Sequence, residues 1–151
     1  MHLTNYAINK ESKDYKIDTD GVTHKRSLEE IWTSLEEIYE SARIEEVKSE
    51  IDSIIMKTIL SAYNKLSNCY KKHVKEECID SICFEILGFD ILLDRGLKPW
   101  LIEVNHAPSF ATETKFDQEL KQGLVLDTLK LINLTPLKKQ KYKEWAKERR
   151  G

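Results

Sequence analysis

The chain has 151 residues, 40% hydrophobic and 33% charged, with only five glycines and three prolines. This length is enough for one domain with its own core, and the composition excludes collagen-like, linker-like and most disordered chains. A formal net charge of −2 gives no sign of a nucleic-acid binder, and no apolar run reaches the ~20 residues of a membrane span.

The first part of the chain predicts a strand, a loop and a helix. Residues 1–9 alternate loosely between apolar and polar side chains, which favours a short strand, and the polar residues 10–25 favour a surface loop. Ser27 and Glu30 have the spacing of a helix-capping box. Apolar side chains then recur every three or four residues, so we expect an amphipathic helix over 28–42.

Longer apolar stripes predict two more helices. One runs over about 47–74 and carries Ile51, Ile54, Ile55, Ile59, Ala62, Tyr63 and Leu66 without an intervening Pro or Gly. Its lysine-rich end suits the negative end of the helix dipole. The other runs over about 114–132, and Pro136 follows its end.

Between these helices, two apolar, β-prone segments at 82–93 and 99–105 flank turn-forming residues. They predict an antiparallel hairpin. A turn centred between Gly96 and Leu97 would place Asp90 opposite Glu103. The predicted fold class is therefore α+β, with antiparallel strands packed against about three helices.

The hairpin carries the candidate chemistry. Asp90 and Glu103 would face each other, and Asn105 would share their face because side chains alternate along a strand. Two carboxylates and an amide oxygen are hard ligands of the kind that Mg²⁺ prefers, and a cation would offset the repulsion between the carboxylates. Alternatively, these are solvated residues on the exposed face of an ordinary hairpin, and a one-residue slip would separate them.

Several segments together resemble one enzyme family. Residues 84–94 (FEILGFDILLD), 98–105 (KPWLIEVN) and 107–110 (APSF) resemble the signature block of the tubulin–tyrosine ligase-like family. Residues 2–10 (HLTNYAINK) resemble an earlier block of this family, in the right order, and 127–129 fit the helix that follows. The resemblance covers about residues 2–134.

This resemblance implies an ATP-grasp ligase, in which ATP lies between two α+β subdomains. An acceptor carboxylate is phosphorylated to an acylphosphate, and the amine of an amino acid then displaces phosphate. Residues 1–137 would be the C-terminal portion of such a domain, a partial ATP-grasp fold, and 138–151 a basic tail. The segment 103–110 is most similar to the glutamylase branch, so the expected reaction adds free L-glutamate to glutamate side chains of tubulin tails. Tyrosine or glycine remain alternative donors.

The resemblance also implies roles for individual residues. Asp90, Glu103 and Asn105 would hold Mg²⁺ against the phosphates of ATP, as part of the catalytic site. Thr4 and Asn5 match a pair near the nucleotide phosphates.

Three further residues match substrate-binding positions. Lys25 would bind the carboxylate of the incoming amino acid, and Tyr6 would flank its pocket. His106 would meet the acceptor carboxylate or transfer a proton, which makes it a candidate catalytic residue as well. The alternatives are a solvated cation for Lys25, a packing role for Tyr6, and a loop histidine bonded to backbone for His106.

Part of the family's ATP site has no counterpart here. Such ligases use earlier lysines and an earlier segment to hold ATP, and the chain contains no glycine-rich phosphate loop in their place. We therefore expect the isolated chain to be inactive. The alternative function is a truncated, non-catalytic relative that binds microtubules.

The C-terminal tail and the rest of the chain carry opposite net charges. Residues 138–151 carry a net charge of +5 and the rest of the chain −7. This tail is either a solvated terminus or a contact for an acidic partner such as a tubulin tail. We expect no nucleic-acid or membrane partner, and a location in the cytoplasm at the cytoskeleton, with a cilium or basal body as one setting.

The cysteines do not form a recognisable framework. Their number, three, and the lack of a CxxC pair indicate a reducing compartment. Zinc binding by Cys69, His73, Cys78 and Cys83 is disfavoured because neither CxxC nor HxxxH spacing occurs.

Overall fold

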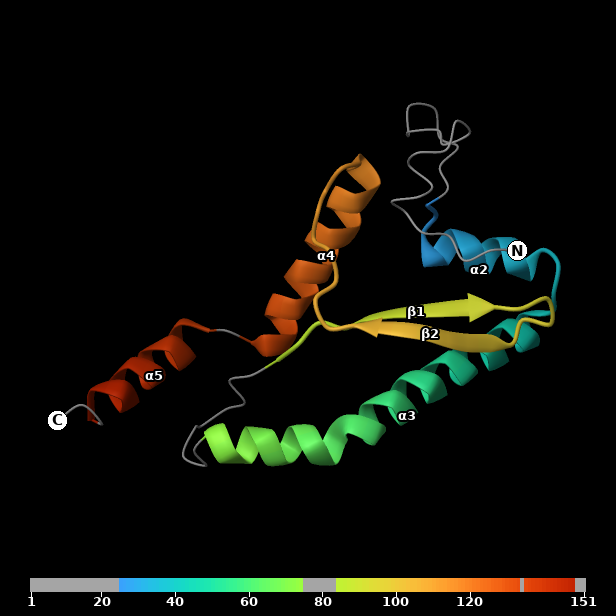
Figure 1. The fold of residues 1–151 in the computed structure, drawn as a ribbon. Helices are drawn as coiled ribbons and strands as arrows, with labels where there is room; N and C mark the ends of the chain where they lie inside the picture. The colour runs from blue at the N-terminus through green and yellow to red at the C-terminus, as the bar shows by residue number, and fades with distance from the viewer. Residues whose placement is uncertain (1–24, 75–83, 134, 149–151) are drawn as a thin grey trace. The chain divides into compact units, whose positions relative to one another are not determined.

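The computed structural model describes residues 25–74, 84–133 and 135–148. They form, in chain order, α2 (Leu28–Glu36), α3 (Ser41–His73), β1 (Gly88–Leu93), β2 (Pro99–Asn105), α4 (Lys115–Ile132) and α5 (Pro136–Glu148) (Figure 1). The α+β class is confirmed, and the expected strand over 1–9 lies outside the described residues. None of the described helices has the length and apolar character needed to cross a membrane. The chain divides into two compact units, Met1–Pro108 and Ser109–Gly151.

Helix α2 begins where the sequence predicts. The Ser27 side chain accepts a hydrogen bond from the Glu30 amide at 3.1 Å, and the Glu30 carboxylate accepts one from the Ser27 amide at 2.8 Å. This capping box satisfies amides that the helix itself leaves unpaired, a contribution of ~1 kcal/mol. The start of the helix is therefore determined locally.

The expected end of this helix, near Ala42, is wrong. The chain leaves the helix after Glu36, where the Leu35 carbonyl accepts from the amides of both Ile38 and Tyr39 at 3.0 and 2.8 Å. Ile38 continues the apolar spacing but is 73% exposed, and no Gly or Pro marks the break. The turn lets α3 pack against α2, which is a tertiary reason for the early end.

Helix α3 confirms the second predicted helix but starts earlier, at Ser41 rather than near residue 47. The additional turn contributes Ile44 and Val47, which are fully buried. Towards the C-terminal end of α3, the described residues leave its apolar side chains uncovered: Tyr63 and Leu66 are 58% and 60% exposed. Only the N-terminal part of this helix therefore contributes to the described core.

Strands β1 and β2 form a two-stranded antiparallel sheet, so the predicted hairpin is confirmed. The first strand is shorter than expected, beginning at Gly88 rather than residue 82. The loop contains three residues, closed by an Asp94 amide to Lys98 carbonyl bond of 3.1 Å, with Leu97 at φ 59°. A residue in this left-handed conformation is typical of three-residue hairpin loops. The loop is thus centred on Gly96, and not between Gly96 and Leu97.

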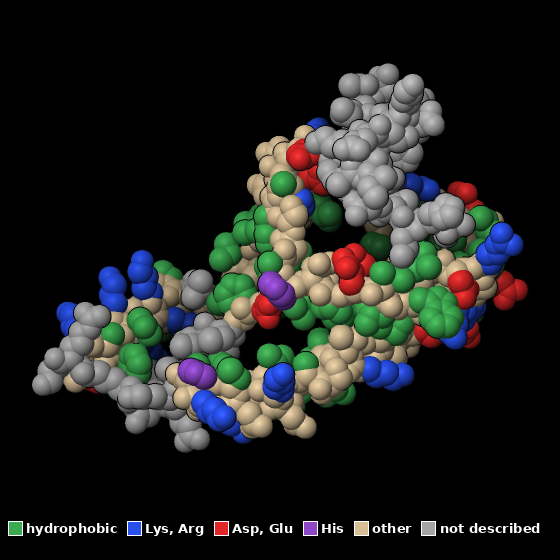
Figure 2. Space-filling view, viewed as in Figure 1, with side chains coloured by type: hydrophobic (Ala, Val, Ile, Leu, Met, Phe, Trp, Pro, Cys, Tyr) green, Lys and Arg blue, Asp and Glu red, His purple; other side chains and the backbone are tan. Residues whose placement is uncertain are grey.

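The core of this unit lies where the loop meets the helices. Leu97 is only 5% exposed and clusters with Ile44 and Val47, and Trp32, Leu35, Ile51 and Leu93 pack around them. In Figure 2, hydrophobic side chains lie along the side of the hairpin that faces α3, and acidic side chains lie over the middle of the hairpin. The buried loop residue therefore anchors the hairpin to α3.

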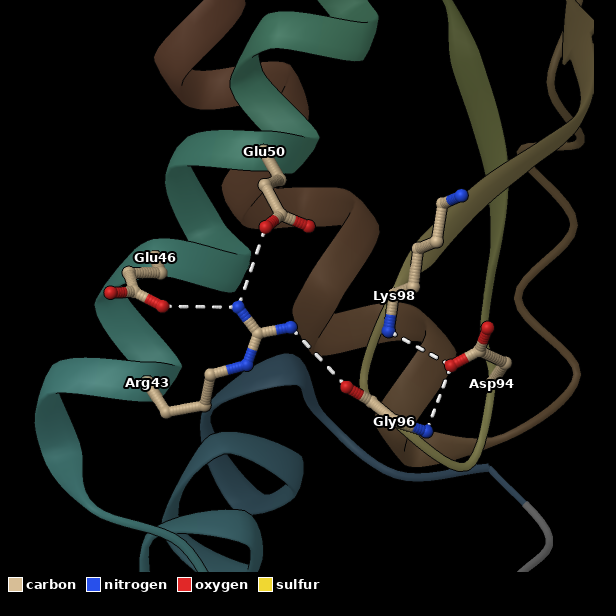
Figure 3. A network of polar contacts seen from close by, with 6 residues as sticks. All are labelled: Arg43, Glu46, Glu50, Asp94, Gly96 and Lys98. Atoms are coloured by element: carbon tan, nitrogen blue, oxygen red, sulfur yellow. Dashed lines mark hydrogen bonds and ion pairs between the residues drawn. The ribbon is translucent and has the colours of Figure 1, made fainter.

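A polar network supports the same loop (Figure 3). One oxygen of Asp94 accepts from the amides of Gly96 and Lys98 at 2.8 and 3.0 Å, and the other accepts from the Trp100 indole at 3.0 Å. Arg43 of α3 donates to the Gly96 carbonyl at 3.2 Å. The Trp100 indole, followed by the Lys98 amide, holds the pKa of the Asp94 carboxyl below its ordinary value.

This lowered pKa has a consequence for stability. A carboxylate with a depressed folded pKa stabilises the fold above its unfolded pKa of ~3.9, and the contribution is lost as pH falls through the folded value. We expect Asp94→Asn to lower the melting temperature at pH 7, and its difference from wild type to shrink at pH 3. Circular dichroism melting curves measure this, with Asp52→Asn on exposed α3 as the matched control. A difference that stays constant with pH would contradict it.

The second unit contains α4 and α5. The predicted helix over 114–132 is confirmed: Thr114 caps α4 by accepting from the Asp117 amide at 3.1 Å, and Asn133 ends it at φ 52°. The basic tail, for which the sequence pattern predicts no helix, forms α5 over most of its length. The rings of Tyr142 and Trp145 lie 5.6 Å apart on this helix.

Candidate functional site

The hairpin brings the two predicted carboxylates together. Asp90 of β1 is paired with Glu103 of β2, and Gly88 with Asn105. On the loop side, however, Ile91 pairs with Leu101, so Ile102 is an extra residue in β2. This is a β-bulge, a local insertion that changes which side chains share a face.

The bulge decides the register of the site. From the three-residue loop alone, an unbroken ladder would place Asp90 opposite Ile102 and would turn Glu103 to the other face. The extra residue restores the pairing of Asp90 with Glu103. The predicted pair is therefore confirmed, although the assumed turn centre is wrong by half a residue and the bulge compensates for it.

The side-chain pattern of β2 does not locate the bulge. Residues 102–105 alternate between apolar and polar side chains, but the four residues 99–102 (PWLI) are all apolar. With the observed register, Asp90, Glu103 and Asn105 share one face, while Leu93 of the other face packs against the core. A single inserted residue exchanges the faces of the strand residues that follow it, and within an apolar run that exchange leaves no mark in the sequence.

The electrostatics of this face are unfavourable without a cation. Partial burial, then a hydrogen bond shared with Glu103 and the negative charge of Glu103, raise the pKa of Asp90 above its ordinary value. The Asn105 side-chain amide donates to a Glu103 oxygen at 3.1 Å. Neither carboxylate forms an ion pair with another described residue. The pair therefore carries concentrated negative charge on an exposed face.

This donor set fits Mg²⁺ bound with a phosphate ligand. Asp90, Glu103 and Asn105 offer two carboxylates and an amide oxygen, and Mg²⁺ usually takes few protein ligands and completes its shell with water and phosphate. Within 25–74, 84–133 and 135–148, no three His, Cys, Asp or Glu side chains are grouped to hold a metal. The three oxygen-bearing residues could hold one side of a metal–phosphate complex.

The other predicted site residues are placed as follows. His106 follows directly after β2 and is exposed, one residue beyond Asn105. Lys25 is exposed and interacts within the protein. Thr4, Asn5 and Tyr6 lie outside the described residues. The structure thus brings Asp90, Glu103 and Asn105 together, with His106 adjacent in the chain.

The disfavoured zinc candidates are only partly described. Cys69 and His73 share a face of α3, with 3.8 Å between the Cys69 sulfur and His73 Nδ1. The same ring nitrogen lies 2.8 Å from the Cys69 carbonyl oxygen, so it is already in hydrogen-bond contact with the helix backbone. Cys78 and Cys83 lie outside the described residues.

Comparison with known proteins places this hairpin in a family. The model of the tubulin-tyrosine ligase family matches residues 1–142. The chain is 45% identical over 149 residues to tubulin polyglutamylase TTLL6 of Homo sapiens, covering 99% of this chain and 16% of that protein. It is 46% identical over 149 residues to tubulin polyglutamylase ttll6 of Danio rerio, covering 99% of this chain and 19% of that protein.

A third relative provides a similar match. The chain is 44% identical over 139 residues to a probable beta-tubulin polyglutamylase of Tetrahymena thermophila, covering 89% of this chain and 12% of that protein. The chain therefore spans less than a fifth of the length of these relatives. Because the family model matches nearly the whole sequence, the chain belongs to the tubulin-tyrosine ligase family.

Proposed function

We propose that this chain forms part of an ATP-dependent ligase that adds L-glutamate to glutamate side chains of tubulin tails. The observation that carries the proposal is the pairing of Asp90 with Glu103, supported by Asn105, in a member of this ligase family. The names of the relatives, all tubulin polyglutamylases, support glutamate as the donor and tubulin as the acceptor.

The reaction joins a carboxylate to an amine. The acceptor carboxylate takes the terminal phosphoryl group of ATP to give an acylphosphate and ADP. The amine of glutamate then attacks the acyl carbon, phosphate leaves, and an amide bond has formed. When bound, Mg²⁺ supplies charge neutralisation at the phosphates. Asp90, Glu103 and Asn105 would hold the metal–phosphate complex on one face of the hairpin.

The remaining residues act around this centre in the proposed site. Thr4 and Asn5 contact the nucleotide, Lys25 pairs with the carboxylate of the incoming glutamate, and Tyr6 flanks it. His106, next to Asn105 in the chain, faces the acceptor carboxylate or transfers a proton as the amide forms. The ammonium group of glutamate must lose a proton before its nitrogen can attack, and a nearby imidazole could accept that proton.

The proposal extends to the domain organisation. Residues 1–137 would be the C-terminal portion of an ATP-grasp ligase domain, and 138–151 would be its basic tail. Helix α5 carries five lysines and two glutamates, and its surface would attract the glutamate-rich tails of tubulin. A protein with this substrate acts at the cytoskeleton.

The decisive test measures ATP-dependent incorporation of labelled glutamate, tyrosine or glycine into tubulin by the complete gene product. We expect incorporation of glutamate, its loss in Asp90→Asn, and its retention in the matched control Asp52→Asn. Incorporation of tyrosine or glycine alone would overturn the donor assignment.

A non-catalytic relative that binds microtubules is the competing function, and the cationic surface of α5 favours it. Co-sedimentation with microtubules at two salt concentrations, combined with calorimetry of Mg²⁺-dependent nucleotide binding, separates the two functions. Salt-sensitive binding to microtubules without nucleotide affinity would support the competing function and contradict the ligase.

A further inference from the structure

We propose that Gly88 is a positioning residue for the metal-binding face, acting through Asn105 and Pro108. This inference rests on the proposed function, because it concerns how the proposed Mg²⁺ ligands are held. Gly88 leaves room at the end of the hairpin for Asn105, the last residue of β2, and for the chain segment that follows it.

The geometry explains why this position has no side chain. A Cβ atom on Gly88 would lie 3.3 Å from Pro108 Cβ, 3.6 Å from Asn105 Cβ and 3.9 Å from the Asn105 carbonyl oxygen. The backbone of Gly88 does not adopt the left-handed conformation that favours glycine. The close approach of Pro108 is therefore the feature that a side chain at residue 88 would disturb.

The contact leads directly to the proposed ligands. Asn105 is the ladder partner of Gly88, and its side chain donates to Glu103 at 3.1 Å. A methyl group at residue 88 would press Pro108 outward by a few tenths of an ångström. Because only two residues separate Asn105 from Pro108, that displacement would pass to Asn105 and to its bond with Glu103.

Mg²⁺ is sensitive to a displacement of this size. It requires near-ideal octahedral geometry with oxygen distances of about 2.0–2.1 Å, whereas Ca²⁺ accepts irregular shells at about 2.3–2.6 Å. A small shift of Asn105 should therefore weaken nucleotide binding in the presence of Mg²⁺ more than nucleotide binding in the presence of Ca²⁺. A general loss of stability would weaken both equally, so the choice of ion separates positioning from folding.

The test compares Gly88→Ala with Gly123→Ala in the complete gene product. Gly123 of α4 is the matched control, because a Cβ there meets nothing within 4 Å. Calorimetry measures the affinity for a non-hydrolysable ATP analogue with Mg²⁺ or with Ca²⁺, without turnover. We expect the affinity of Gly88→Ala for this analogue to fall ~10-fold with Mg²⁺ and less than ~3-fold with Ca²⁺. Equal losses with both ions, or no loss, would overturn the inference.

A rescue variant keeps the inference testable if Gly88→Ala folds poorly. Pro108→Gly removes the nearest contact, so the double variant Gly88→Ala/Pro108→Gly should recover most of the Mg²⁺-dependent affinity relative to Pro108→Gly alone. No recovery would overturn the role of Pro108 and, with it, the proposed path to Asn105.

Failure of this inference can be distinguished from failure of the proposed function. If the wild type shows no Mg²⁺-dependent nucleotide binding that Asp90→Asn removes, both are overturned. If the wild type shows that binding and Gly88→Ala behaves like Gly123→Ala, only the role of Gly88 is overturned.

Discussion

Asp90→Asn is expected to stabilise the hairpin in metal-free buffer and, at the same time, to lower the proposed ligase activity strongly. The substitution removes one of two like charges that face each other across the ladder, a repulsion of about 0.2–1 kcal/mol. It also removes a proposed Mg²⁺ ligand. Since a bound metal contributes several kcal/mol to transition-state stabilisation, turnover should fall by ~10²–10³-fold.

Two measurements check this pair of effects. Thermal unfolding in the presence of a chelator reports stability, and glutamate incorporation into tubulin reports activity. Asp52→Asn, the same chemical change on exposed α3, should alter neither. A destabilised Asp90→Asn variant that keeps full activity would show that the carboxylate supports the fold and does not bind the metal.

Asp94 differs from Asp90 in the sign of the expected effect. Both residues belong to the hairpin, Asp90 to β1 and Asp94 to the loop, yet the pKa of Asp90 is raised and that of Asp94 is lowered. Asp90 faces a carboxylate, whereas Asp94 accepts hydrogen bonds from the Trp100 indole and two backbone amides. Asparagine should therefore raise stability at residue 90 and lower it at residue 94.

Leu97→Ala is expected to lower the free energy of unfolding by ~2–5 kcal/mol, more than any of the charge substitutions above. Leu97 is 5% exposed and fills the core between Ile44 and Val47, the two fully buried side chains of α3. The described core is small, so a cavity at this position removes a large part of the packing that anchors the loop. Hydrogen–deuterium exchange of the β1 and β2 amides measures the loss as faster local opening.

Two companion variants test the reason for that effect. Leu60→Ala on α3, where the side chain is 60% exposed, should change stability by no more than ~0.5 kcal/mol. Leu97→Gly should relieve ~1 kcal/mol of left-handed backbone strain at φ 59° and still leave the cavity. The Leu97→Gly variant should therefore remain less stable than the wild type. A Leu97→Ala variant that exchanges like wild type would mean that the hairpin is held by the Arg43 and Asp94 network alone.

The sequence predicted those features whose cause is local. Ser27 and Glu30 interact within one helical turn, and their capping box was correctly identified. The third helix, over 114–132, was also correct because Thr114 caps it and Asn133 ends it locally. The chemical character of the candidate site followed from the residue types on two neighbouring strands.

Features that depend on distant contacts were not predicted. The end of α2 at Glu36 has no Gly or Pro signal, because it depends on the packing of α3 against α2. The three-residue loop was missed because burial against Ile44 and Val47 stabilises a leucine at positive φ, which is otherwise unfavourable.

By itself, the sequence determined that this is an α+β chain of the tubulin-tyrosine ligase family, with Asp90, Glu103 and Asn105 on the two strands of a hairpin. Only the tertiary structure showed that a bulge at Ile102 produces the pairing of Asp90 with Glu103. It also showed that Pro108 and Asn105 lie close to Gly88. Local sequence patterns indicate which side chains alternate between the faces of a strand and which residues cap a helix. Register and close approach are decided by packing between segments, because a shift of one residue in β2 reverses every side chain that follows.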